Sequence, residues 1–157
     1  AEMASRNIFK DKDDITYFTD DFAWNEYPGP LCYCGKRGCL ERWVSGTGLK
    51  RDYFYVTGEE HSTHEIIANA QKGEKKAVAA FDRYTDRLAR AYAFVINILD
   101  PDVIVVGGGM SSVEKIYEDV PEIWGKYIYA QNPKTKLLPA RHGDSSGIRG
   151  AAWLSKN

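Results

Sequence analysis

The stretch Asp102-Val-Ile-Val-Val106-Gly-Gly-Gly109 decides the fold class of this 157-residue chain. An unbroken run of β-branched residues between turn-forming residues is typical of a buried strand in a parallel sheet. The glycines end that strand, and a helical pattern begins at about Ser112. A second strand is expected over residues 136–140, where Pro139 marks its end or an edge. Strands interleaved with helices predict an α/β fold.

Helical patterns surround the two expected strands. The longest covers residues 74–99, where apolar side chains recur at steps of three and four, and Asp100-Pro101 ends it. This long helix is the expected spine of the core. Shorter helices are expected after the N-cap residues Ser45 and Thr63, from Pro121, and over residues 148–154.

The cysteines of the chain are Cys32, Cys34 and Cys39, which fall within eight residues. Such clustering favours a tetrahedral zinc site with thiolate ligands, and Gly35 and Gly38 suit the tight turn that it needs. A disulfide that leaves one thiol over, or three free structural cysteines, are the alternatives. The sequence assigns no fourth ligand, because none of the histidines lies nearby; they are His61, His64 and His142.

Two further features are candidate binding elements. Glu41 follows the last thiol by two residues, and a carboxylate held by a rigid metal site can accept hydrogen bonds from the vicinal hydroxyls of a sugar; otherwise it is a solvated surface charge. Gly107, Gly108 and Gly109 would let a flat ring or a phosphate approach the backbone, or they simply form a tight turn. Neither a G-x-G-x-x-G motif nor a lysine-bearing P-loop is present, which disfavours dinucleotide binding and P-loop hydrolysis.

Composition narrows the class of protein. The net charge of −1 gives no general attraction to nucleic acid or to an acidic membrane. Ten tyrosines and four tryptophans argue against disorder, and no stretch has the length needed to span a bilayer. No apolar signal segment opens the sequence, so we expect a soluble, cytoplasmic protein without nucleic-acid or membrane partners.

The motifs together resemble a known family, the ROK sugar kinases and repressors. The resemblance rests on Cys32-x-Cys34-Gly-x-x-Gly-Cys39-x-Glu41, on Ser45-Gly-Thr-Gly48, on residues 97–110 and on residues 142–153. Within the family the chain is most similar to the bacterial fructokinase or mannokinase branch. The resemblance implies an actin-like, ribonuclease-H-like fold whose two lobes close around a sugar and ATP with Mg²⁺. Residues 31–157 would form the carboxyl-terminal lobe, and residues 1–30 an irregular lead-in segment.

The resemblance also assigns roles to residues. Cys32, Cys34 and Cys39 would bind structural zinc, Glu41 would bond sugar hydroxyls, and residues 107–109 would line the adenosine pocket. The family's catalytic aspartate and phosphate loops have no counterpart here, and Ser5 stands where the family places a zinc-binding histidine. We therefore expect no catalytic residue in this chain, no activity of the chain alone, and a homodimer that covers the exposed edges. A non-catalytic binding or structural module that keeps the ROK scaffold is the alternative.

Overall fold

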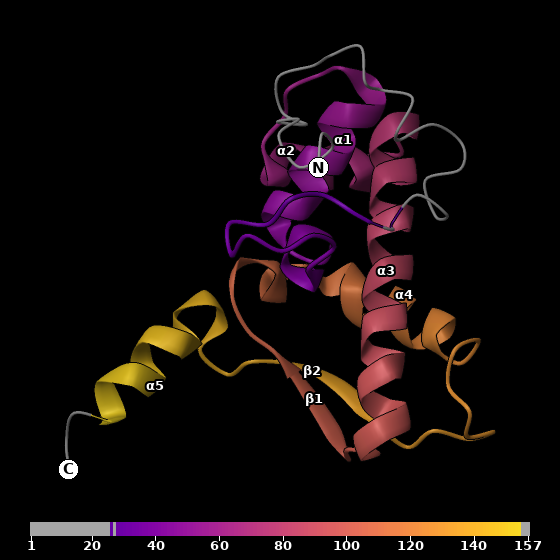
Figure 1. Cartoon of the computed structure of the whole chain (residues 1–157), viewed down its shortest axis with the longest axis vertical. Helices are drawn as coiled ribbons and strands as arrows, with labels where there is room; N and C mark the ends of the chain where they lie inside the picture. The colour runs from indigo at the N-terminus through magenta and orange to yellow at the C-terminus, as the bar shows by residue number, and fades with distance from the viewer. Residues whose placement is uncertain (1–25, 27, 155–157) are drawn as a thin grey trace. The chain divides into compact units, whose positions relative to one another are not determined.

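The computed structural model describes residue 26 and residues 28–154, so most of the expected lead-in segment lies outside the described residues. The chain divides into two compact units, and the boundary falls between Phe81 and Asp82, within the longest helix. None of the helices in the described part of the chain is both long and apolar enough to cross a bilayer. The elements, in chain order (Figure 1), are η3 (Leu40–Arg42), α1 (Gly46–Thr57), α2 (Thr63–Gln71), α3 (Lys75–Leu99), β1 (Val103–Val106), η4 (Gly109–Ser112), α4 (Glu114–Trp124), β2 (Lys136–Pro139), η5 (Gly143–Ser145) and α5 (Ser146–Leu154).

In the first unit, α1 packs against α2 around the fully buried side chains of Leu49 and Ile66. The hydroxyl of Ser45 accepts a hydrogen bond from the Gly48 N–H at 3.0 Å, which confirms the predicted N-cap of α1. The second helix begins as expected, but its cap is Ser62 rather than Thr63. Ser62 and Glu65 form a reciprocal capping box, which satisfies two N–H groups at once.

A polar cluster around Glu59 ties the end of α1 to the start of α3 within the same unit. The Glu59 carboxylate accepts hydrogen bonds from the Tyr53 hydroxyl at 3.1 Å and from the Lys76 ammonium at 2.6 Å. These two donors, Lys76 first, lower the pKa of Glu59. Burial, followed by the bond to Glu59, raises the pKa of Tyr53 to about 12, so the hydroxyl keeps its proton as the donor.

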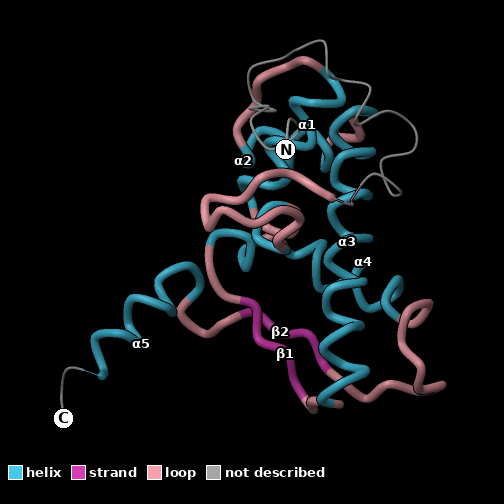
Figure 2. The backbone as a smooth tube through the Cα atoms, viewed as in Figure 1, coloured by secondary structure: helices cyan, strands magenta, loops and turns pink. Residues whose placement is uncertain are grey.

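In the second unit, β1 and β2 form a two-stranded parallel sheet that pairs Val103 with Lys136 and Val106 with Pro139 (Figure 2). Parallel pairing confirms the predicted strand direction. The expected burial of the whole β1 strand is wrong, since Val103 is 40% and Val105 60% exposed. Alternate residues of a strand face opposite sides of the sheet. Helix α4 packs on β2 over the side that buries Val106, so Val103 and Val105 lie on the opposite, exposed side.

The helices of this unit differ from expectation at one point. Pro121 does not begin a helix but lies inside α4. A proline there removes one backbone hydrogen bond. The buried side chains of Ile116, Val120 and Trp124 lie on one face of α4, and their burial holds the helix together across the proline. The long helix α3 matches its prediction and ends at Leu99, and the next residue, Asp100, has a left-handed φ of 41°.

Asn97, in the last turns of α3, fixes the segment that follows α4. Its side-chain amide donates to the carbonyl of Tyr127 at 2.9 Å, and its oxygen accepts from the N–H of Tyr129 at 2.8 Å. The Tyr127 hydroxyl also donates to Asp86 at 2.7 Å. One asparagine thus replaces two main-chain hydrogen bonds that an irregular segment would otherwise lack.

Candidate functional site

The cysteine segment forms a small antiparallel turn, here called the knuckle (residues 28–39). Leu31 pairs with Arg37 as an isolated bridge. The N–H of Cys32 donates to the carbonyl of Lys36 at 2.8 Å, and the N–H of Gly35 donates back to the carbonyl of Cys32 at 3.0 Å. This turn brings the sulfur atoms of all three cysteines within 4.8 Å of one another.

Glycines allow the knuckle to close. Gly29, Gly35 and Gly38 all have left-handed φ angles, of 72°, 81° and 68°. A Cβ atom on Gly29 would lie 2.6 Å from the Cα of Gly38, so the two backbones touch at this point. A Cβ atom on Gly35 would meet nothing within 4 Å. The sequence predicted Gly35 and Gly38 as turn residues, but it did not predict that Gly29, at the start of the knuckle, contacts Gly38.

The three sulfur atoms fit a tetrahedral metal site. Zinc–sulfur bonds of about 2.3 Å at tetrahedral angles place neighbouring sulfurs about 3.8 Å apart. The sulfurs of Cys34 and Cys39 are 3.5 Å apart, and all three thiols are free of disulfides. Bound zinc would cross-link the turn and add its binding free energy to the stability of the folded knuckle.

Hydrogen bonds shift the pKa values of Cys34 and Cys39 in opposite directions. The backbone N–H of Lys36, and then the Cys39 thiol, lower the pKa of Cys34. Donation to Cys34 raises the pKa of Cys39 to about 11. Cys34 therefore ionises before Cys39.

Glu41 lies in η3, directly after the knuckle. Its backbone carbonyl accepts a hydrogen bond from the Ser45 hydroxyl at 2.6 Å, and the N–H of Arg42 donates to the carbonyl of Cys39 at 2.8 Å. The residue itself is exposed. A Cβ atom on Gly48 would lie 2.9 Å from the carbonyl oxygen of Trp43, so this glycine lets α1 start close to η3. The main chain of Glu41 is fixed, and its carboxylate is available to a ligand.

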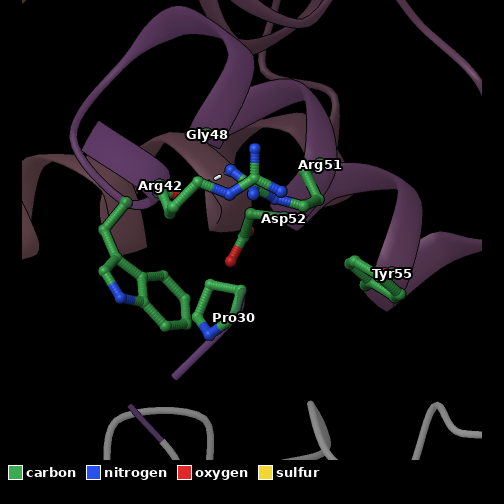
Figure 3. Close-up of a pocket in the computed structure, with 7 residues that line it drawn as sticks. Pro30, Arg42, Gly48, Arg51, Asp52 and Tyr55 are labelled. Carbon is green, nitrogen blue, oxygen red and sulfur yellow. Dashed lines mark hydrogen bonds between the residues drawn. The ribbon is translucent and has the colours of Figure 1, made fainter. Parts of the chain in front are cut away.

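A small pocket lies beside η3 and α1 in the first unit (Figure 3). Arg51 reaches across it and donates to the carbonyl of Arg42. Burial, and then the neighbouring positive charge of Arg42, lower the pKa of Arg51 to about 10. Glu41 does not line this pocket. The residues that line it are Pro30, Arg42, Trp43, Gly48, Arg51, Asp52 and Tyr55. We read this pocket as packing that joins η3 to α1.

The glycine loop at the end of β1 has open space around it. Cβ atoms on Gly107, Gly108 or Gly109 would meet no atom within 4 Å. Gly108 has a φ of 78°, and its carbonyl accepts a hydrogen bond from the Ser111 hydroxyl at 2.7 Å. Protein packing does not require small residues at all three positions, whereas close approach of a ligand to the backbone would.

A second loop joins the glycine loop. η5 packs against η4, because β1 and β2 run parallel and their carboxyl ends lie at the same edge of the sheet. The carboxyl edge of a parallel sheet is where ligands bind in open α/β folds. Gly143 and Asp144 of η5 therefore lie at the same candidate ligand-binding edge as the glycine loop. These residues belong to the sequence motif at residues 142–153, and the position of that motif after a predicted strand is the signal that indicates a binding role.

The sequence matches the ROK family over residues 22–157, and the chain belongs to that family. It is 42% identical over 124 residues to an N-acetyl-D-glucosamine kinase of Vibrio atlanticus, which covers 79% of this chain and 41% of the relative. The N-acetyl-D-glucosamine kinase of Yersinia enterocolitica is 37% identical over 134 residues, or 85% of this chain and 44% of the relative. The chain thus spans less than half the length of these curated relatives.

Solved structures show the same relationship. A ROK glucokinase from Streptomyces griseus, in complex with glucose and AMPPNP, aligns with a TM-score of 0.71 and 26% identity over 80% of this chain and 47% of its own. A ROK hexokinase from Thermus thermophilus aligns with a TM-score of 0.68 and 30% identity over 83% of this chain and 46% of its own. The chain therefore has the fold of part of the actin-like ROK kinases.

Proposed function

We propose that this chain is the carboxyl-terminal part of an ATP-dependent hexose kinase and resides in the cytoplasm. One observation carries the proposal: an open glycine loop lies at the carboxyl edge of a parallel sheet in a chain that aligns with sugar kinases. Gly107, Gly108 and Gly109 would face the adenosine of ATP, and Glu41 would accept hydrogen bonds from the sugar. In this proposal Cys32, Cys34 and Cys39 hold one structural zinc ion.

The relatives favour glucose or N-acetylglucosamine as the sugar, because these are the sugars in their names. The fructokinase branch suggested by the motifs remains a prediction. Calorimetric titration of the chain with glucose, N-acetylglucosamine and fructose ranks the three. Binding of fructose alone would overturn the preference drawn from the relatives.

Phosphoryl transfer needs a base for the sugar hydroxyl and positive groups around the transferred phosphate, held in line across a closed site. Mg²⁺ bound with ATP supplies part of that positive charge. The residues of this chain would contribute orientation, through the Glu41 carboxylate and the backbone of the glycine loop. We propose that the chain alone is not catalytically competent, and ATP-dependent sugar phosphorylation by the purified chain would contradict this.

The nucleotide role is tested with Gly107→Val. This glycine has no positive φ and no neighbour within 4 Å of a Cβ atom, so the substitution should leave the fold intact. If adenosine lies against the loop, AMPPNP affinity falls at least tenfold. Gly125→Val is the matched control, since Gly125 is also free of neighbours but lies at the end of α4. Equal affinity in both variants would argue against the site.

A non-catalytic module is the second candidate function. A ROK family transcriptional regulator, a homologue of the E. coli MLC protein, aligns with a TM-score of 0.63 and 26% identity over 82% of this chain and 35% of its own. The same titrations separate the two cases, because a kinase part binds AMPPNP and sugar. A chain that binds neither, yet folds and holds zinc, is a scaffold.

We also propose that the isolated chain forms a homodimer. One face of the two-stranded sheet exposes Val103, Val105 and Leu138, and parallel sheets are otherwise covered on both faces. Val105→Lys places a charge on that face without disturbing buried packing. Sedimentation should show a dimer for the wild-type chain and a monomer for the variant. A well-folded wild-type monomer at high concentration would contradict the proposal.

A further inference from the structure

We propose that Ser45 is a positioning residue for sugar binding, because its hydroxyl fixes the peptide group that joins Glu41 to Arg42. This role rests on the proposed function, in which the Glu41 carboxylate binds the sugar. Ser45 opens the Ser45-Gly-Thr-Gly48 motif and caps α1, and its hydroxyl also reaches back to η3.

The peptide group between Glu41 and Arg42 is held at both of its polar atoms. Its carbonyl oxygen, on Glu41, accepts a hydrogen bond from the Ser45 hydroxyl at 2.6 Å. Its N–H, on Arg42, donates to the carbonyl of Cys39 at 2.8 Å. The peptide is planar, so rotating it about ψ of Glu41 would break both hydrogen bonds. The direction of the Cα–Cβ bond of Glu41 relative to this peptide is therefore set by the knuckle on one side and by α1 on the other.

The proton of the Ser45 hydroxyl is committed to this bond. A serine hydroxyl has one proton to donate and two lone pairs that accept. The N–H of Gly48 donates to the Ser45 oxygen at 3.0 Å, and the Thr47 hydroxyl lies 2.9 Å from the same oxygen. A carbonyl oxygen cannot donate, so the Ser45 proton points to Glu41 and Thr47 must be the donor of the third bond. All hydrogen-bonding sites of the Ser45 hydroxyl are then used, which fixes its orientation.

An anchored main chain matters for a carboxylate that is exposed. Glu41 is exposed, and a long side chain in water keeps most of its torsional freedom. Binding of a sugar orders that side chain at a cost in conformational entropy, and a main chain that is already fixed reduces the cost. Loss of the Ser45 hydroxyl frees the peptide group and should weaken sugar binding by at least about tenfold, the magnitude of one hydrogen bond to a charged group.

Thr57 offers a matched control within the same helix. Its hydroxyl also donates to a carbonyl, that of Tyr53 at 2.7 Å, and accepts from an N–H, that of Glu59 at 3.1 Å. Thr57 is the last residue of α1, at the opposite end of the helix from Ser45. Thr57→Val therefore removes the same kind of hydroxyl from α1 without touching η3. Ser45→Thr is the conservative variant, because threonine keeps the hydroxyl and also caps helices.

The test titrates the complete 157-residue chain and its variants with glucose and with N-acetylglucosamine in a calorimeter. Ser45→Ala should bind sugar at least about tenfold more weakly than the wild-type chain, whereas Thr57→Val and Ser45→Thr should match it. A second measurement needs no sugar. Hydrogen exchange of the Arg42 amide should be faster in Ser45→Ala than in Thr57→Val when both are compared at the same free energy of unfolding.

Each contrary result has a separate meaning. Equal sugar affinity of Ser45→Ala and Thr57→Val overturns the positioning role, and so does an equal exchange rate of the Arg42 amide in the two variants. Binding by Ser45→Thr that is as weak as that of Ser45→Ala also overturns it, because the hydroxyl would then not be the group that matters. These three results leave the proposed function intact, since the wild-type chain still binds sugar. A wild-type chain that binds neither sugar overturns the sugar role of Glu41, and the positioning role falls with it.

Discussion

Substitution of two glycines in the knuckle by alanine tests how the thiols are brought together. Gly29 and Gly35 both have left-handed φ angles, so an alanine at either position pays a conformational penalty of about 1–2 kcal/mol. Only at Gly29 does the new Cβ atom meet backbone, at 2.6 Å from the Cα of Gly38 and 2.7 Å from the carbonyl oxygen of Glu26. Carbon atoms normally pack about 3.5–4.0 Å apart, so the overlap there is about 1 Å.

No side chain can move to relieve this overlap, because both contacts are with main-chain atoms. The knuckle of Gly29→Ala must open, and the opened form separates the three sulfurs. We expect Gly35→Ala to lower the free energy of unfolding by about 1–2 kcal/mol. Gly29→Ala should lower it by at least about 2 kcal/mol more, since overpacking without relaxation has that magnitude.

The assay is a Co²⁺ titration of both variants, followed by urea unfolding of the zinc-loaded forms. A further 1.4 kcal/mol lost from the closed knuckle corresponds to about a tenfold rise in the Co²⁺ dissociation constant. Gly29→Ala should therefore bind Co²⁺ at least about tenfold more weakly than Gly35→Ala. Equal Co²⁺ affinity and equal stability of the two variants would refute the reasoning. The conformational penalty at left-handed φ, which both variants share, would then account for the whole loss, and the backbone overlap at Gly29 would contribute nothing.

Three further predictions concern stability in urea. Glu59→Gln should lower the urea midpoint of unfolding at neutral pH, because bonds from Lys76 and Tyr53 lower the pKa of Glu59. The stabilisation that the Glu59 carboxylate provides is therefore present above the ordinary glutamate pKa and is lost as the pH falls through the lowered value. A difference from the wild-type chain that persists in strong acid would contradict this. Asn97→Ala removes both hydrogen bonds to the segment after α4 and should lower the free energy of unfolding by about 1–3 kcal/mol. An unchanged urea midpoint would mean that these two hydrogen bonds do not stabilise the segment. Ile116→Ala empties a fully buried site and should lower it by about 2–5 kcal/mol, whereas a smaller loss would mean that α4 packs loosely.

Local sequence signals predicted the elements and the thiol group well. Ser45 caps a helix because its hydroxyl reaches an N–H three residues later, a contact that depends on neighbouring residues only. The spacing of the three cysteines likewise brings them together through one tight turn. Such features depend on a few adjacent dihedral angles, so they can be inferred from the sequence.

Non-local features were harder to predict. The exposure of Val105 depends on how many strands and helices cover the sheet, and a single β-branched run does not contain that information. Pro121 is tolerated inside α4 because buried neighbours stabilise the helix around it. The contact of Gly29 with Gly38, and the packing of η4 on η5, likewise join segments that sequence patterns treat separately.

The zinc content of the purified chain tests the central claim most directly. The three sulfur atoms are grouped for one metal ion, so elemental analysis and native mass spectrometry should find one zinc per chain. Replacing all three cysteines by serine should abolish it. A folded wild-type chain with no zinc after purification in zinc-containing buffer would contradict the account, and the knuckle would then be only a close-packed turn.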